Sequence, residues 1–294
     1  LLVNLGTPAA PQAEAVRRYL AEFLSDPRVV KLPRWLWLPI LHGIVLRLRP
    51  GRSAEKYAQV WTPEGSPLAV CTARQAALLA QRTGIAVEYA MRYGEPSIAS
   101  ALERLGSREV VVVPLYPQYA ESTTASVADK VPPRLRMVQD FHDHPAYIAA
   151  LAALVERHWA RHGRGSMLLM SFHGLPKRGA GGYERQCRTT GRLLAEALRM
   201  DESEWRVTFQ SRFGFAEWLQ PYTEPTLVEM AKSGRTRLDV VCPGFVCDCL
   251  ETLEELGITA RKAFLDAGGR EFHLVACLND SPQWIAALER IALG

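Results

Sequence analysis

Short apolar runs without a polar break alternate along this chain with longer segments of helical period. Val110, Val111, Val112 and Val113 form the clearest of these runs. A strand that is apolar on both faces is typical of a parallel sheet whose two faces are covered by helices. The pattern therefore predicts an α/β fold, with strands at residues 1–5, 87–91, 110–115, 167–172, 206–210 and 238–242.

Several short motifs of the first half recur in the same order in the second half. Residues 1–8 align with 168–176, and residues 112–114 align with 240–243. The length of 294 residues also suits two domains of about 150 residues each. We therefore predict a duplicated α/β domain with its join near residues 140–145. Because ligands of such sheets bind at the carboxyl ends of the strands, two domains that face each other would form one cleft.

Charge and hydropathy exclude several classes of protein. The 35 basic and 31 acidic residues give a formal net charge of +4, which is too balanced for a dedicated nucleic-acid binder. We find no signal peptide and no stretch of the roughly 18 apolar residues that a membrane span needs. The chain begins at Leu1 inside a strand-like run, so we expect further residues before it. There is no P-loop or dinucleotide fingerprint, so phosphoryl transfer and cofactor-driven redox chemistry are not predicted.

The six cysteines are sparse and mostly flanked by strand-like residues. This pattern favours reduced thiols in a cytosolic protein over a disulfide framework. The alternative is an iron–sulfur cluster on Cys242, Cys247, Cys249 and a fourth cysteine, but their spacing matches none of the common cluster motifs. We therefore do not expect a cluster.

One histidine directly follows a predicted buried strand. His173 comes after the strand at 167–172 and before Gly174. At this position an imidazole faces either the core or the binding edge of the sheet. The other histidines in this half include those at 142, 144, 158 and 162, around a predicted surface helix, and we expect these four to be solvated. No permanent zinc site is predicted.

Three carboxylates fall on one stripe of another predicted helix. Asp248, Glu251 and Glu255 lie within about 60° of one another at α-helical spacing. Such a stripe is either a solvated face or a set of groups that meets a cation. On the duplicated fold it lies beside His173. One imidazole with several carboxylates suits a divalent metal such as iron(II), and it also suits proton uptake.

Other segments have both a structural and a functional interpretation. The hydroxyl-rich turn at 117–126 is either a helix entry or an anion-contacting loop. Arg92 ends a strand and is a candidate partner for a carboxylate. Trp218 belongs either to the core or to the wall around a flat apolar ligand. The apolar run that starts at Trp35 has basic residues on both sides, so it is either a buried connector or a lip that enters anionic lipid.

Together these motifs resemble the ferrochelatase family, and the matches run nearly from end to end. The likeness is greatest to the bacterial, protoporphyrin-type members among the class I chelatases. The matching segments are residues 4–8, 65–68, 92–93, 116–119, 122–124, 171–176, 210–212, 218–219 and 248–253.

The resemblance implies two Rossmann-like domains, each a parallel sheet flanked by helices, facing each other across a porphyrin cleft. The first would hold residues 1–144 together with a C-terminal helix at 280–294. The second would hold residues 145–279 and the catalytic groups.

The same resemblance assigns roles to single residues. His173 matches the catalytic histidine and Glu251 its acidic partner, and both are expected to bind the metal. Asp248 and Glu255 would continue from them as a metal path or a proton relay. The residues expected to bind the porphyrin are Asn4, Leu5, Tyr57, Arg92, Tyr93, Tyr116, Gln118, Ser122, Thr123 and Trp218. The expected lip consists of Trp35, Trp37, Leu38, Ile40 and Leu41.

The implied activity is that of a lyase that inserts Fe²⁺ into protoporphyrin IX and releases two protons, the terminal step of haem biosynthesis. Fe²⁺ is then a substrate, and no organic cofactor is required. A [2Fe–2S] cluster is not expected, because the cysteine-bearing C-terminal extension of the animal enzymes is absent. The alternatives are a coproporphyrin ferrochelatase, another tetrapyrrole metal chelatase, or a two-domain protein that binds a ligand in its cleft without catalysis.

The resemblance also suggests where such a protein works. The expected place is the cytoplasm, peripherally on the inner face of the membrane. The lip would contact anionic lipid there. The preceding oxidase of the haem pathway is a candidate partner, whereas nucleic acid is not.

Overall fold

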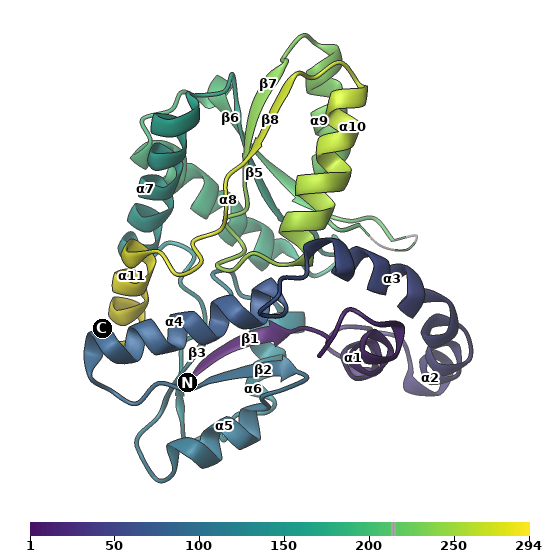
Figure 1. Ribbon diagram of the computed structural model, residues 1–294, viewed down its shortest axis with the longest axis vertical. Helices are drawn as coiled ribbons and strands as arrows, with labels where there is room; N and C mark the ends of the chain where they lie inside the picture. Colours follow the sequence, from purple (N-terminus) through teal and green to yellow (C-terminus); the bar gives the residue numbers. More distant parts are fainter. Residues whose placement is uncertain (213, 215) are drawn as a thin grey trace. The chain divides into compact units, whose positions relative to one another are not determined.

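The computed structural model describes residues 1–212, 214 and 216–294. The chain forms two compact units, whose strands and helices are labelled in Figure 1. Unit 1 comprises Leu1–Leu115 and Ala120–Gln139, and unit 2 comprises Tyr116–Tyr119 and Asp140–Gly294.

Unit 1 is built on a parallel sheet of four strands in the order β2-β1-β3-β4. Four of the five residues of the interior strand β1 are buried, which is typical of a strand covered on both faces. The strands are β1 (Leu2–Gly6), β2 (Tyr89–Tyr93), β3 (Val111–Pro114) and β4 (Arg136–Met137). The helices are α1 (Ala13–Ser25), α2 (Arg34–Ile40), η1 (Leu41–Val45), α3 (Leu46–Val60), α4 (Pro67–Thr83), α5 (Ile98–Leu105), η2 (Glu121–Ala125) and α6 (Ser126–Ala128).

Unit 2 contains a second parallel sheet of four strands, in the order β6-β5-β7-β8. Its interior strand β5 is buried except at its last residue. The strands are β5 (Leu168–His173), β6 (Trp205–Gln210), β7 (Arg237–Val241) and β8 (Glu271–Leu274). The helices are α7 (Pro145–His162), α8 (Gly181–Ala197), η3 (Glu202–Glu204), α9 (Thr223–Lys232), η4 (Glu251–Ala260), α10 (Arg261–Asp266) and α11 (Pro282–Leu293).

The two sheets have the same strand order when the strands are matched in sequence. This confirms the predicted α/β class with two similar parallel sheets. The strands β4 and β8 were not predicted. β8 is an edge strand in which the polar Glu271 and His273 alternate with apolar residues, so it lacks the continuous apolar run that identified the interior strands.

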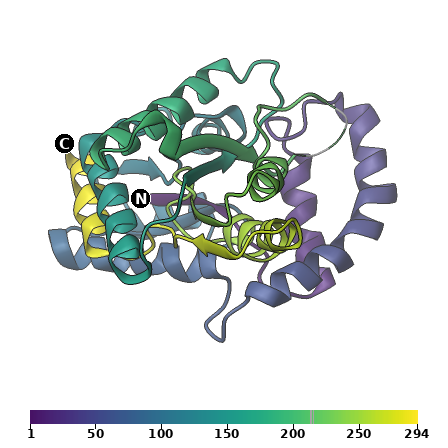
Figure 2. The same ribbon diagram turned by 90° about the horizontal axis from the view of Figure 1, so that it is seen from above.

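Helix α11 packs against α7 within unit 2, as both views show (Figures 1 and 2). Trp284 of α11 is completely buried, and its ring centre lies 5.8 Å from that of Phe141 and 6.2 Å from that of Tyr147. Because these aromatic contacts tie the helix to α7, the segment 280–294 groups with unit 2. The resemblance had implied a place in the first domain.

The predicted lip divides between the core and the surface of unit 1. Leu41 is completely buried in the cluster that α1 forms with its neighbours, so it is a core residue and not part of an exposed lip. Trp37 and Leu38 pack against the same cluster, and Trp37 Nε1 donates to the carbonyl oxygen of Leu24 at 2.7 Å. Ile40 is half-buried.

An exposed apolar surface remains on this part of unit 1, and we call it the lip surface. Trp35 is 79% exposed and Leu48 is 72% exposed, which is unusual for such large apolar side chains. None of the helices in the described part of the chain is long and apolar enough to cross a membrane. The lip surface consists of Leu32, Trp35, Leu36, Ile44 and Leu48.

Candidate active site

His173 is the last residue of the interior strand β5. Its Nδ1 lies 2.6 Å from the carbonyl oxygen of Gly174. A carbonyl oxygen can only accept, so in the neutral ring Nδ1 carries the proton and Nε2 keeps its lone pair. The Tyr183 hydroxyl donates to the His173 carbonyl oxygen at 2.8 Å and holds the backbone. The half-buried ring thus offers a basic nitrogen that can accept a proton or bind a metal.

A glycine follows His173 because the chain passes very close to β6 at this point. The Gly174 N–H donates to the Gln210 carbonyl oxygen at 2.8 Å. A Cβ atom on Gly174 would lie 2.6 Å from that same oxygen and 3.2 Å from the Trp218 ring. Only glycine, which has no Cβ, lets the backbone at position 174 lie this close to Gln210 and to the Trp218 ring.

Glu251 and Glu255 lie on the π-helix η4, where the sequence predicted an α-helix. In a π-helix each N–H bonds to the carbonyl five residues earlier, so one turn holds more than four residues. Residues four apart therefore stack closely, and Glu251 and Glu255 share one face. The Gln210 side-chain amide donates to the Glu251 carbonyl oxygen at 2.8 Å and ties the start of η4 to the end of β6.

Ser211 binds both carboxylate oxygens of Glu255. Its backbone N–H donates to Oε1 and its hydroxyl donates to Oε2, each at 2.6 Å. Ser211 has a φ of 64°, in the left-handed region that residues other than glycine rarely adopt. Such strained conformations cluster at functional sites. Ser211 belongs to the family motif at residues 210–212, and its contact with Glu255 was not predicted.

The charges of His173 and Glu251 both affect the pKa of the Glu255 carboxyl group. Burial raises the pKa of its carboxyl group, and the negative charge of Glu251 raises it further. Hydrogen bonds from Ser211 and the positive charge of a protonated His173 lower the same pKa. The structure therefore brings His173, Glu251 and Glu255 into one electrostatic environment.

Asp248 has a different set of partners from the two glutamates. Its carboxylate accepts from the Thr252 hydroxyl at 3.0 Å and from the Asn279 amide at 2.7 Å. Its own N–H donates to the Asn279 side-chain oxygen at 2.9 Å. Asp248 precedes η4, so the α-helical spacing that grouped it with the glutamates does not apply. Its carboxylate anchors the loop around Asn279.

The cysteines around the site are buried thiols. Burial raises the pKa of Cys249 well above its ordinary value, and the charge of Glu251 and a hydrogen bond with it act in the same direction. Burial likewise raises the pKa of Cys242 and Cys277. Burial thus disfavours the thiolate form of these side chains.

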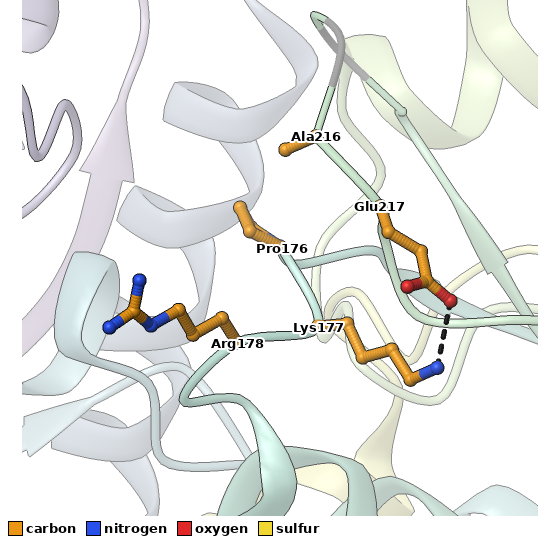
Figure 3. A pocket seen from close by; sticks show the side chains of 5 residues that line it. All are labelled: Pro176, Lys177, Arg178, Ala216 and Glu217. Carbon is orange, nitrogen blue, oxygen red and sulfur yellow. Dashed lines mark hydrogen bonds and ion pairs between the residues drawn. The ribbon is translucent and has the colours of Figure 1, made fainter.

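Two loops of unit 2 form a short ladder that positions Trp218. Trp218 pairs with Pro176, and the Lys177 N–H donates to the Glu217 carbonyl oxygen at 2.9 Å. The Lys177 and Glu217 side chains form an ion pair at 2.7 Å, on the rim of an open pocket of about 330 Å³ (Figure 3). The indole Nε1 of Trp218 is buried but donates no hydrogen bond to any described residue.

Arg92 and Tyr93 of unit 1 share a partner that the sequence analysis missed, Asp26. The Arg92 guanidinium pairs with the Asp26 carboxylate and donates to the Ser126 carbonyl oxygen at 2.7 Å. The Tyr93 hydroxyl donates to Asp26 Oδ2 at 2.9 Å, and burial raises the Tyr93 pKa well above its ordinary value. The charge of Arg92 is thus compensated within unit 1.

The remaining predicted porphyrin ligands differ in burial. Asn4 donates to the Thr72 hydroxyl at 3.0 Å, and Gln118 donates to the Thr190 hydroxyl at 3.0 Å, so both buried amides bind neighbours of their own unit. The half-buried residues of the set are Leu5, Tyr57, Tyr116, Ser122 and Thr123.

Comparison with known proteins identifies the family. Residues 1–293 match the family model described as Ferrochelatase. The protein named Ferrochelatase from Polaromonas sp. (strain JS666) is 57% identical over 308 residues, which cover 98% of this chain and 84% of the relative. The chain belongs to the ferrochelatase family. The Ferrochelatase of Aromatoleum aromaticum is 55% identical, over 99% of this chain and 86% of the relative. As a member of this family the chain is a lyase that inserts iron into a porphyrin.

Solved structures with the same fold are much more distant from this ferrochelatase in sequence. SirB from Bacillus subtilis with Fe³⁺ is 17% identical with a TM-score of 0.55, over 78% of this chain and 92% of that chain. CbiX, the terminal enzyme for siroheme biosynthesis in denitrifying bacteria, is 17% identical with a TM-score of 0.51, over 99% and 96% of the two chains. At this identity the likeness shows the fold alone.

The Ser211→Ala variant of this ferrochelatase tests whether Ser211 controls the protonation of Glu255. The variant keeps the backbone N–H but loses the hydroxyl donor, so the Glu255 pKa should rise further above its ordinary value. We expect the acidic limb of the kcat profile to move to higher pH, with little change in KM for the porphyrin. A Ser233→Ala variant, whose hydroxyl bonds only within the C-terminal turn of α9, serves as the control. An unchanged acidic limb in Ser211→Ala would exclude this role.

Proposed function

We propose that this chain inserts Fe²⁺ into protoporphyrin IX with release of two protons. The observation that carries the proposal is the grouping of one imidazole, whose Nε2 has no hydrogen-bond partner among the described residues, with the carboxylates of Glu251 and Glu255. Imidazole and carboxylate together suit a borderline divalent metal, and an imidazole nitrogen with a free lone pair can also accept a proton.

The charges balance in this arrangement. Two pyrrole protons leave the ring as one dication enters it. His173 Nε2 accepts one pyrrole proton, and Glu255, whose pKa burial raises, accepts the other. Glu251 and Glu255 offer oxygen ligands to the entering Fe²⁺, while Ser211 fixes the second of them. We place Trp218 against the flat ring, because the chain that follows His173 passes directly beside its indole.

The experiment that tests the activity is anaerobic addition of Fe²⁺ to the purified chain with protoporphyrin. We expect the porphyrin fluorescence to disappear with multiple turnovers and the absorbance of haem to appear. Tight binding of the porphyrin without loss of fluorescence would instead indicate a ligand-binding protein.

A second arm of the same assay tests the choice of porphyrin. Protoporphyrin carries two propionates and coproporphyrin carries four, so an apolar binding surface would desolvate the extra carboxylates at a cost. The compensation of Arg92 by Asp26 also removes one cation that could have met an additional carboxylate. We therefore propose protoporphyrin as the substrate. Faster turnover of coproporphyrin would contradict this choice.

We further propose that the lip surface binds anionic lipid, which would hold the enzyme peripherally at the cytoplasmic face of the membrane. Arg47 and Arg52 follow in the same stretch of the sequence and are exposed. Apolar insertion combined with basic residues is the usual pattern of interfacial binding. At that place the enzyme could take the porphyrin from the oxidation that generates it. No organic cofactor and no [2Fe–2S] cluster form part of this proposal.

The lipid contact can be measured by sedimentation with vesicles. We expect binding to vesicles of anionic phospholipid and not to vesicles of neutral phospholipid, with a marked decrease at high salt. A Trp35→Ser/Leu48→Ser variant should lose this binding. The control is Ile85→Ser, which removes another apolar side chain of unit 1 that is 50% exposed but outside the lip surface. Equal binding by both variants would rule out the lip surface as the contact.

A further inference from the structure

Three histidines gather on one face of unit 2, and we call them the histidine cluster: His158, His162 and His273. His158 and His162 are four residues apart on α7 and so lie on the same side of that helix. His273 is on β8 and is the register partner of Asp239 on β7. The three ring centres lie 4.7, 5.6 and 5.7 Å apart.

This cluster lies toward the beginning of the strands, away from His173. Asp239 is the register partner of Leu168, the first residue of β5, whereas His173 is the last residue of that strand. At about 3.3 Å per residue, the two positions are separated by roughly 16 Å along the sheet. The cluster is therefore distinct from the candidate active site.

A buried carboxylate oxygen faces the cluster and lacks a partner. Asp239 is 1% exposed, and its Oδ2 accepts from Trp159 Nε1 at 2.7 Å and from the Gly165 N–H at 2.8 Å. Its Oδ1 has no hydrogen bond to any described residue and lies 3.9 Å from His158 Nε2, which is also buried and likewise has no partner in the described part of the chain. Two such unpaired atoms are costly in a protein interior, and their facing each other suits them to bind a common ligand.

The sequence analysis expected His158 and His162 to be solvated, but the His158 side chain is only 13% exposed. Burial lowers the pKa of His158, and the positive charges of neighbouring His162, His273 and Arg237 lower it further, while Asp239 raises it. A neutral imidazole is the form that binds a metal.

We propose that the histidine cluster and Asp239 bind one divalent transition-metal ion of the zinc class. Three imidazoles bound tetrahedrally to zinc at about 2.0–2.1 Å place their ring centres roughly 5 Å apart, which matches the observed spacing. Asp239 completes a four-ligand set of nitrogen and oxygen, and its second oxygen is fixed by Trp159 and Gly165, as is usual for metal-binding carboxylates.

The ring nitrogens must still turn toward a common point. Among the described residues, only Asp140, His142 and Asp143 already have ligand atoms within 4.8 Å of one another. His162 is exposed and His273 is half-buried, so both rings can rotate toward the ion. The bound ion would tie the end of α7 to β7 and β8.

The proposal is tested by titrating the metal-free full chain with Zn²⁺ in a calorimeter. All proteins carry the His173→Ala substitution, so that binding at the candidate active site does not contribute. We expect one Zn²⁺ per chain at the cluster. Co²⁺ in its place should give the visible absorption of a tetrahedral site.

Two variants locate the ion. His158→Ala removes the most buried ligand, and His162→Gln removes the exposed one with little risk to folding, which circular dichroism verifies. Each should weaken Zn²⁺ binding at least tenfold, whereas the control His42→Ala, which removes an exposed histidine of unit 1, should not. No binding of Zn²⁺, or equal affinity in His162→Gln and His42→Ala, would overturn the proposal.

Discussion

Replacing His173 by alanine should abolish iron insertion while the porphyrin still binds. His173 Nδ1 carries the proton and donates it to the Gly174 carbonyl oxygen, which leaves Nε2 as the available base or metal ligand. Loss of a positioned acid–base group typically lowers the rate by roughly 10²–10⁴-fold. Turnover is measured by anaerobic loss of porphyrin fluorescence on addition of Fe²⁺, and binding by titration of the porphyrin without metal.

A matched control separates the ring from the local backbone. Tyr183→Phe removes only the hydroxyl that donates to the His173 carbonyl oxygen and leaves the imidazole in place. We expect this variant to keep its turnover within about tenfold of the unmodified chain, since one neutral hydrogen bond contributes about 1 kcal/mol. Near-normal turnover by His173→Ala would remove the imidazole from the mechanism.

Replacing Glu251 by glutamine should lower kcat at least a hundredfold. Glutamine has nearly the same shape but removes the negative charge, so it cannot take up a proton or offer an anionic ligand to Fe²⁺. The loss of that charge should also lower the pKa of Glu255, which Glu251 raises in the unmodified chain. For the residual activity, the acidic limb of kcat plotted against pH should therefore lie at lower pH. Measuring kcat over a range of pH checks this.

The control for this change lies on the same helix. Glu254→Gln neutralises a buried carboxylate that accepts from the Thr259 hydroxyl at 2.9 Å. In the described part of the chain, no hydrogen bond joins Glu254 to His173 or to Ser211. We therefore expect kcat to change by no more than a few-fold. If both variants lose activity equally, the effect comes from η4 as a whole and Glu251 has no special role.

The interior strands were predictable because burial on both faces leaves an unbroken apolar run in the sequence. The same rule fails at an edge, and β8 was missed because Glu271 and His273 interrupt it. The lip prediction included Leu41 because a run of apolar letters does not show which side of a helix faces the core.

Within the candidate site, the residue types were predictable and their partners were not. The sequence could place an imidazole after a buried strand. The grouping of Asp248 with Glu251 assumed α-helical spacing, but the segment is a π-helix that begins after Asp248. The pairing of Arg92 with Asp26 joins residues 66 apart in the chain, and local patterns carry no signal of such a contact. The solvated interpretation of His158 failed for a similar reason, because β7 and β8 cover that side of α7.

The end of β6 has a consequence for how the enzyme can move. Two consecutive residues, Gln210 and Ser211, hold Glu251 and Glu255, and Gln210 is also the register partner of His173. The distance between His173 and the start of η4 therefore depends on the hydrogen bonds of the sheet, because Gln210 is part of β6. A rearrangement of η4 during a catalytic cycle would therefore break the hydrogen bonds of both residues, Gln210 to the Glu251 carbonyl oxygen and Ser211 to the Glu255 carboxylate.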